Sequence, residues 1–149
     1  GACCRIGAIL GLASPEEEEA VAAYALDLGK TFQIVDDLLD FTGDARVLGK
    51  PVLSDLGEGR ITLPLIHALK RTDRTGRARL KALIGRKDVS ADERRDLLAL
   101  LDGTGAFDHA LERAREFTER ALERIDGFPD SPPRETLIRL AVYGLTRSR

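Results

Sequence analysis

Apolar residues recur along most of the chain at the three- and four-residue spacing of an amphipathic helix, and no segment of length alternates with period two. The pattern predicts a protein built from helices. We expect them over residues 2–12, 15–41, 63–70, 74–86, 90–101, 107–125 and 134–143 or beyond. Residues 42–59 are rich in glycine and are expected to form a loop with a short turn of helix.

Three local features sharpen this prediction. Ser14 precedes Pro15 and a run of glutamates, which is a typical helix start. Ser90 with Glu93 three residues later forms the sequence of a capping box. The apolar stripe within 107–125 is most simply explained as core packing.

Composition limits the classes of function. The chain of 149 residues has the size of one ordinary domain, and its net charge of -2, with basic and acidic residues interspersed, gives no nucleic-acid signature. No apolar run approaches the roughly 20 residues of a membrane span, and no signal peptide is visible. Adjacent Cys3 and Cys4 lack the spacing of a disulfide or a zinc site, so we expect small buried residues of a reducing, cytoplasmic compartment.

The segment Gln33–Asp40 is the most informative stretch for chemistry, because Asp36, Asp37 and Asp40 lie in an otherwise apolar helical run. Residues four apart share a helix face, so Asp36 and Asp40 are expected on one exposed or cavity-facing stripe, with Asp37 at its edge. The apolar flanks predict a helix buried nearly all round, where unpaired carboxylates are costly. A hard divalent cation such as Mg²⁺ is their natural partner.

Cations follow directly after these carboxylates. Lys50 lies in a Gly-Lys-Pro sequence, and Arg60 follows Asp55 in a glycine-containing segment. Glycine lets a backbone approach a ligand closely, and cations beside a metal-binding acid cluster suit a diphosphate bridged by metal. Arg60 has an equally simple interpretation as a surface partner of Glu58.

The segments 29–40, 49–51 and 55–64 together resemble the second aspartate-rich motif of the trans-polyprenyl diphosphate synthases and the sequence that follows it. The tail, with Asp130-Ser131-Pro132-Pro133-Arg134-Glu135 before a closing helix, is most similar to the bacterial long-chain, octaprenyl-type members. The resemblance covers residues 1–149 as the C-terminal portion of a single synthase domain. The first aspartate-rich motif and the isopentenyl diphosphate site of the family have no counterpart here, and Arg60 stands where many members carry lysine.

This resemblance implies an all-α fold, an antiparallel helical bundle of the isoprenoid synthase type, present as its C-terminal half. It implies head-to-tail condensation of an allylic prenyl diphosphate with isopentenyl diphosphate. Asp36, Asp37 and Asp40 would hold Mg²⁺ directly or through water, and Lys50 would contact the allylic diphosphate as the catalytic residue. Gln33, Asp55 and Arg60 would complete the substrate site, with Asp55 orienting the basic groups.

Other functions fit the residues less well. A terpene cyclase needs a second metal motif, which is not found downstream. A calcium-binding loop needs alternating oxygen ligands, which Leu38, Leu39 and Phe41 interrupt. A non-catalytic helical subunit that partners a larger synthase is the alternative, although it would not need the carboxylates and Lys50 intact. His67 and His109, without a partner at ligand spacing, are interpreted as ordinary helix residues.

The chain begins at Gly1 and contains no methionine, which we interpret as a piece of a longer polypeptide. A bundle half would leave Ile6, Ile9 and Leu10 uncovered, and exposed apolar patches favour association. We therefore expect a piece that is inactive alone and that associates, as a homodimer or with its missing N-terminal half.

Overall fold

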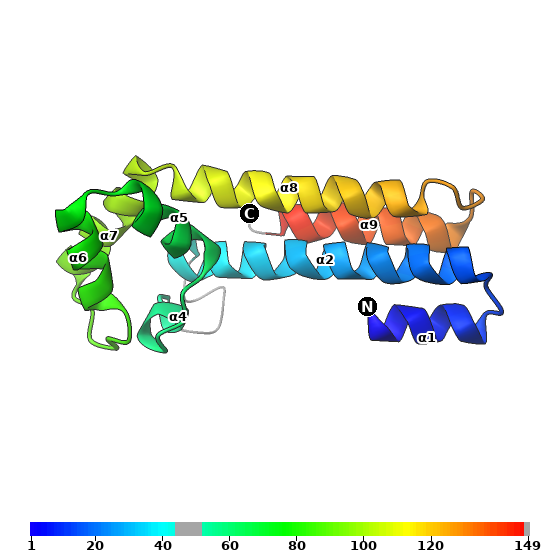
Figure 1. Ribbon diagram of the computed structural model, residues 1–149, viewed down its shortest axis with the longest axis horizontal. Coiled ribbons are helices and arrows are strands. Elements are labelled where there is room, and N and C mark those ends of the chain that lie inside the picture. Colours follow the sequence, from blue (N-terminus) through cyan, green and yellow to red (C-terminus); the bar gives the residue numbers. More distant parts are fainter. Residues whose placement is uncertain (44–51, 148–149) are drawn as a thin grey trace. The chain divides into compact units, whose positions relative to one another are not determined.

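The computed structural model describes residues 1–43 and 52–147, and every regular element in these ranges is a helix (Figure 1). The all-α prediction is confirmed. Among the described helices, none combines the length and the apolar character that a membrane crossing requires. Two compact units divide the chain: unit 1 comprises residues 1–35 and 113–149, and unit 2 comprises residues 36–112.

The N-terminal part of unit 1 consists of α1, Ala2–Leu10, and most of α2, Pro15–Thr42. Helix α2 begins with the predicted cap: Ser14 Oγ accepts a hydrogen bond from the Glu17 backbone N–H at 3.2 Å, and Glu17 Oε2 accepts one from the Ser14 N–H at 2.8 Å. These two bonds satisfy donors that a helix start leaves open. Arg5 of α1 forms an ion pair with Glu19 of α2, so the helices lie side by side.

The remaining helices of unit 1 are most of α8, Ala106–Ile125, and α9, Pro132–Thr146. Thr31 of α2 donates a hydrogen bond to the Ala114 carbonyl of α8 at 3.2 Å, and Arg120 of α8 lies 3.3 Å from Asp27 of α2. Residues earlier in one helix thus meet residues later in the other, which is antiparallel packing. The stripe predicted within 107–125 is core, since Ala114, Ala121 and Ile125 are buried.

Tyr24 anchors α9 against α2. Its hydroxyl donates a hydrogen bond to the Leu137 carbonyl at 2.7 Å, and its side chain is 1% exposed. Burial, with a smaller contribution from Cys4, raises the pKa of Tyr24 to about 12, because the phenolate would lose its hydration. Ser131 caps α9, which begins at Pro132, two residues earlier than predicted.

Unit 2 contains the end of α2, α4 (Ser54–Gly57), α5 (Leu63–Arg71), α6 (Arg74–Leu83), α7 (Ala91–Gly103) and the start of α8. Its core is one cluster of buried apolar side chains that every one of these helices supplies. The cluster contains Phe41, Leu53, Leu56, Leu65, Ala68, Leu80, Leu83, Leu97, Leu101 and Ala106. The short turn of helix predicted within 42–59 is α4.

Two expectations need correction. Cys3 is exposed and Cys4 half-buried, because no residue of α1 is buried. Helix α6 ends at Leu83 and not at residue 86, since Gly85 adopts a φ of 83° and donates its N–H to the Leu56 carbonyl at 2.8 Å. Glycine with a positive φ often follows a helix end, but Leu56 is distant in the sequence, so this contact forms only on folding.

Candidate functional site

The three aspartates near the end of α2 belong to unit 2 and differ sharply in exposure. Asp36 is exposed, Asp37 is 9% exposed, and Asp40 is fully buried at 0%. The predicted helix is therefore not buried all round, and Asp36 is exposed whereas Asp40, one turn later, is buried. The residues that cover Asp40 explain the difference.

Asp40 binds the start of α4 with both carboxylate oxygens. Its Oδ1 accepts hydrogen bonds from the Ser54 hydroxyl at 2.6 Å and from the Ser54 backbone N–H at 3.1 Å. Its Oδ2 accepts the Asp55 backbone N–H at 3.0 Å. Three hydrogen bonds to one buried carboxylate compensate for its loss of hydration.

Local geometry explains why this carboxylate lies where it does. The residue preceding α4 is Leu53, which has no side-chain acceptor for the open N–H groups of the helix start. Leu53 adopts the left-handed conformation, with φ 60° and ψ 24°, and its own N–H donates to the Asp40 carbonyl at 2.8 Å. Asp40 thus performs, from α2, the capping function that a serine or aspartate usually performs within the helix.

Arg60 is fixed by two carboxylates. Its Nη1 donates to Asp55 Oδ1 at 2.9 Å, and its Nη2 lies 2.7 Å from Glu58 Oε2. The chain reaches this position through Gly59, whose φ of 76° suits glycine, and through the Arg60 N–H, which donates to the Asp55 carbonyl at 2.8 Å. Arg60 therefore pairs with Glu58 at the surface, as one interpretation predicted, and also with the largely buried Asp55 beside the aspartates.

Gln33 and Lys50 are the other two predicted site residues. Gln33 belongs to unit 1, where it is an exposed residue of α2. Lys50 lies outside the described residues.

In residues 1–43 and 52–147, no group of three or more histidine, cysteine or acidic side chains is arranged to hold a metal ion together. Both carboxylate oxygens of Asp40 bind the start of α4. Exposed Asp36 remains suitable as a ligand, and Mg²⁺ is commonly held by one or two carboxylates together with substrate phosphates and water.

Two features of this unit escaped the sequence-based prediction. The Ser54 hydroxyl bonds to Asp40 at 2.6 Å, and the sequence hints at this residue only by a Ser-Asp pair after a glycine-rich loop. His67 of α5 and His109 of α8 stack with ring centroids 4.2 Å apart and an interplanar angle of 31°. Partial burial, followed by the positive charges of His109 and Arg71, lowers the pKa of His67.

Comparison with known proteins places these observations in a family. The model of the polyprenyl synthetase family matches residues 1–101. The all-trans-nonaprenyl-diphosphate synthase (geranyl-diphosphate specific) of Rhodobacter capsulatus is 38% identical over 95% of this chain and 43% of its own length. The octaprenyl diphosphate synthase of Escherichia coli is 36% identical over 99% of this chain and 46% of its own length.

Solved structures agree with this match. A polyprenyl synthase of Caulobacter crescentus, complexed with calcium and isoprenyl diphosphate, has a TM-score of 0.87 at 32% identity, over 97% of this chain and 44% of that one. A decaprenyl diphosphate synthase of Rhodobacter capsulatus has a TM-score of 0.81 at 33% identity, over 97% and 44%. The chain thus spans less than half the length of these relatives.

Proposed function

The chain belongs to the polyprenyl synthetase family, and from this membership we propose that it forms the diphosphate-binding portion of a trans-polyprenyl diphosphate synthase. The reaction is head-to-tail condensation of an allylic prenyl diphosphate with isopentenyl diphosphate, which yields an all-trans polyprenyl diphosphate. The observation that carries the proposal is the bonding of Asp40 to the start of α4, because it joins the aspartates to Asp55 and Arg60.

Asp36 and Asp37 would hold Mg²⁺, directly or through water. A bound Mg²⁺ would supply positive charge that stabilises the departing diphosphate. The calcium and isoprenyl diphosphate in the Caulobacter relative support a divalent cation and a prenyl diphosphate as ligands of this family. Asp40 would act as a positioning residue. It holds the start of α4 in place, and it would support metal binding only indirectly, through the residues around it.

Arg60 would bind the diphosphate while Asp55 orients it. A guanidinium has five N–H donors, so the two ion pairs of Arg60 leave donors for a phosphate oxygen. Lys50 would contact the allylic diphosphate, and Gln33 would line the site. We further propose that units 1 and 2 are portions of one synthase domain, which works as a homodimer or together with the remaining portion of the fold.

A chimaera tests this proposal. The aligned segment of the Escherichia coli octaprenyl diphosphate synthase is replaced by this chain, and incorporation of labelled isopentenyl diphosphate is measured at saturating Mg²⁺. We expect Asp36→Ala to lower turnover by on the order of a hundredfold or more, through lost stabilisation of the leaving group, and Lys50→Ala to act on the same step. Asp108→Ala, at an exposed aspartate of the same unit, is the control and should leave turnover unchanged.

The isolated chain should show no prenyl transfer. Unchanged turnover of the Asp36→Ala chimaera would refute the role of the aspartates. If the chain stimulates a larger synthase equally well with and without Asp36, the non-catalytic partner subunit is the correct function instead.

A further inference from the structure

Besides the candidate site, unit 2 contains a cavity of about 560 Å³ lined by residues from 52–53 and 86–98, which we call the second cavity. Its apolar walls come from Val52, Leu53, Val89 and Leu98. Its charged lining is entirely basic within the described ranges and comes from Arg86, Lys87, Arg94 and Arg95. The volume lies in the range of small-molecule sites, which are mostly apolar with few polar groups.

Two of the four cations already have acidic partners. Arg86 binds Glu93 at 2.7 Å, and Arg95 lies 2.9 Å from Asp92. The Arg86 hydrogen bond is the main reason that the pKa of Glu93 falls to about 2. These pairs neutralise Arg86 and Arg95 within the protein.

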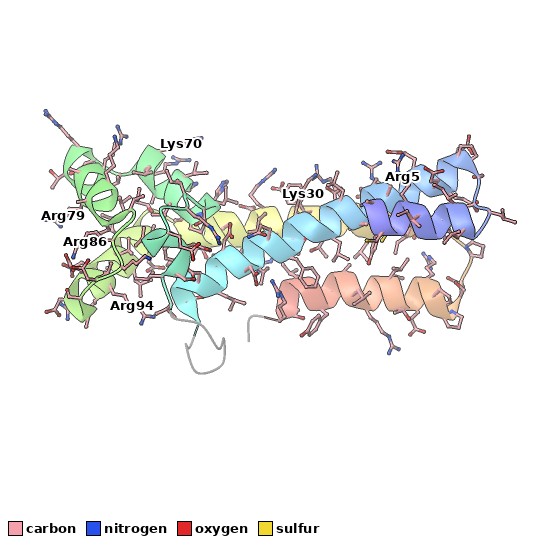
Figure 2. All side chains as sticks on the ribbon, turned by 90° about the horizontal axis from the view of Figure 1, so that it is seen from below. Arg5, Lys30, Lys70, Arg79, Arg86 and Arg94 are labelled. Atoms are coloured by element: carbon pink, nitrogen blue, oxygen red, sulfur yellow. The ribbon has the colours of Figure 1, made fainter. Side chains whose placement is uncertain are left out.

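Arg94 and Lys87 differ in this respect. Arg94, labelled in Figure 2, has a buried Nε without a hydrogen-bond acceptor, and no ion pair joins its guanidinium to a described residue. Lys87 is exposed and likewise has no acidic partner in the described part of the chain. A buried N–H without an acceptor is rare in folded proteins and calls for a partner from outside the chain.

The ligand that fits has two negative charges and an apolar portion. A phosphate monoester carries close to two negative charges at neutral pH, which matches the two unneutralised cations better than a carboxylate does. A guanidinium binds phosphate oxygens through paired hydrogen bonds. We infer that this cavity binds a phosphate monoester on an apolar stem, with Arg94 and Lys87 on the phosphate and the four apolar residues around the stem.

This inference does not depend on the proposed synthase activity. The proposed site at Asp36 combines a metal with Arg60 and Lys50, whereas the second cavity has positive charge from Arg94 and Lys87 and no acidic lining residue in the described ranges. Measurements with EDTA present remove the metal-dependent part of binding at Asp36, and the Arg94 and Lys87 variants identify the second cavity. Asp36→Asn should leave binding at this cavity unchanged.

Isothermal titration calorimetry of the chain with hexyl phosphate and with inorganic phosphate is the direct test. We expect saturable binding of hexyl phosphate that is tighter than that of inorganic phosphate. Arg94→Gln and Lys87→Gln should each weaken it by about tenfold, the loss expected for one charge-assisted contact. Arg79→Gln is the matched control, since Arg79 is an exposed cation of α6 that does not line this cavity.

Vesicles of phosphatidylcholine with and without phosphatidate distinguish a lipid headgroup from a soluble ester. Arg94-dependent binding to the phosphatidate vesicles identifies a lipid headgroup, and binding of hexyl phosphate alone identifies a soluble ester. The inference is overturned if hexyl phosphate does not saturate, if inorganic phosphate binds equally well, or if Arg79→Gln weakens binding as much as Arg94→Gln. Lys87→Gln changes an exposed side chain, so the test stands even if Arg94→Gln fails to fold.

Discussion

Asp36 and Asp40 are one turn apart on the same helix, yet their surroundings give them different tasks. Asp36 is exposed, whereas Asp40 is buried with both oxygens bonded to Ser54 and Asp55. Substitutions at the two positions should therefore separate stability from ligand binding.

We expect Asp40→Asn to destabilise the chain by about 2 kcal/mol. The amide retains one acceptor oxygen but places an NH₂ group against the Ser54 or Asp55 donors, so charge-assisted bonds are lost in a buried setting. Asp36→Asn, at an exposed position, should stay within about 0.5 kcal/mol of the parent chain. Urea unfolding followed by circular dichroism measures both, and equal effects at the two positions would show that Asp40 does not secure α4.

Two glycines of unit 1 offer a second residue-scale prediction. A Cβ added at Gly29, inside α2, would meet nothing within 4 Å, whereas one at Gly144 of α9 would lie 2.8 Å from Phe32 Cε2. Gly29→Ala should stabilise the chain by up to about 1 kcal/mol through helix propensity alone. Gly144→Ala should destabilise it by about 1 kcal/mol, because overpacking against the ring outweighs the same gain.

Thermal and urea unfolding of the two alanine variants compare identical chemical changes in one unit. A stabilised Gly144→Ala variant would mean that Phe32 moves aside freely, despite its backbone carbonyl accepting a bond from Arg147 at 2.8 Å.

At the scale of elements, the sequence predicts best what is decided locally. The starts of α2 and α7 follow from Ser14 and Ser90, whose hydroxyls bond to N–H groups three residues ahead. The end of α6 depends instead on the contact between Gly85 and Leu56, which exists only after folding. The same distinction holds for the candidate site. The sequence motif identifies Asp36, Asp37 and Asp40. The capping role of Asp40 could not be predicted, because it depends on the left-handed Leu53 and on α4.

The stacking of His67 on His109 couples α5 to α8 in a pH-dependent manner. Burial and neighbouring positive charge lower the folded-state pKa of His67 from its ordinary value of 6.5. The unfolded chain therefore takes up a proton at a pH where folded His67 remains neutral. This contribution to stability is present above pH 6.5 and is lost as the pH falls through the lower folded-state pKa.

We expect the urea midpoint to fall between pH 7 and pH 5, and His109→Gln to make this pH dependence shallower by removing one positive neighbour. NMR titration of the His67 ring should give a pKa below 6.5 in the parent chain and a higher one in the variant. An unshifted His67 in the parent chain would contradict the stacked arrangement.

At the scale of the whole molecule, the most unusual feature is a helix with no buried residue. Helix α1 exposes Ile6 at 57%, Ile9 at 54% and Leu10 at 78% of their surface, and Leu12 follows at 91%. Its described polar contacts to α2 are the exposed ion pairs of Arg5, which contribute little. Covering such side chains gains roughly 25 cal/mol per Å² of apolar surface, so a partner surface would stabilise α1 considerably.

We therefore expect the isolated chain to self-associate through α1. Ile9→Glu combined with Leu10→Glu should lower the association constant by at least about tenfold, because charges in an apolar contact lose their hydration. Ile61→Glu, at an exposed apolar residue of unit 2, is the control and should leave association unchanged. Sedimentation velocity over a concentration series measures all three chains, and a parent chain that remains a folded monomer at high concentration would show that α1 needs no partner.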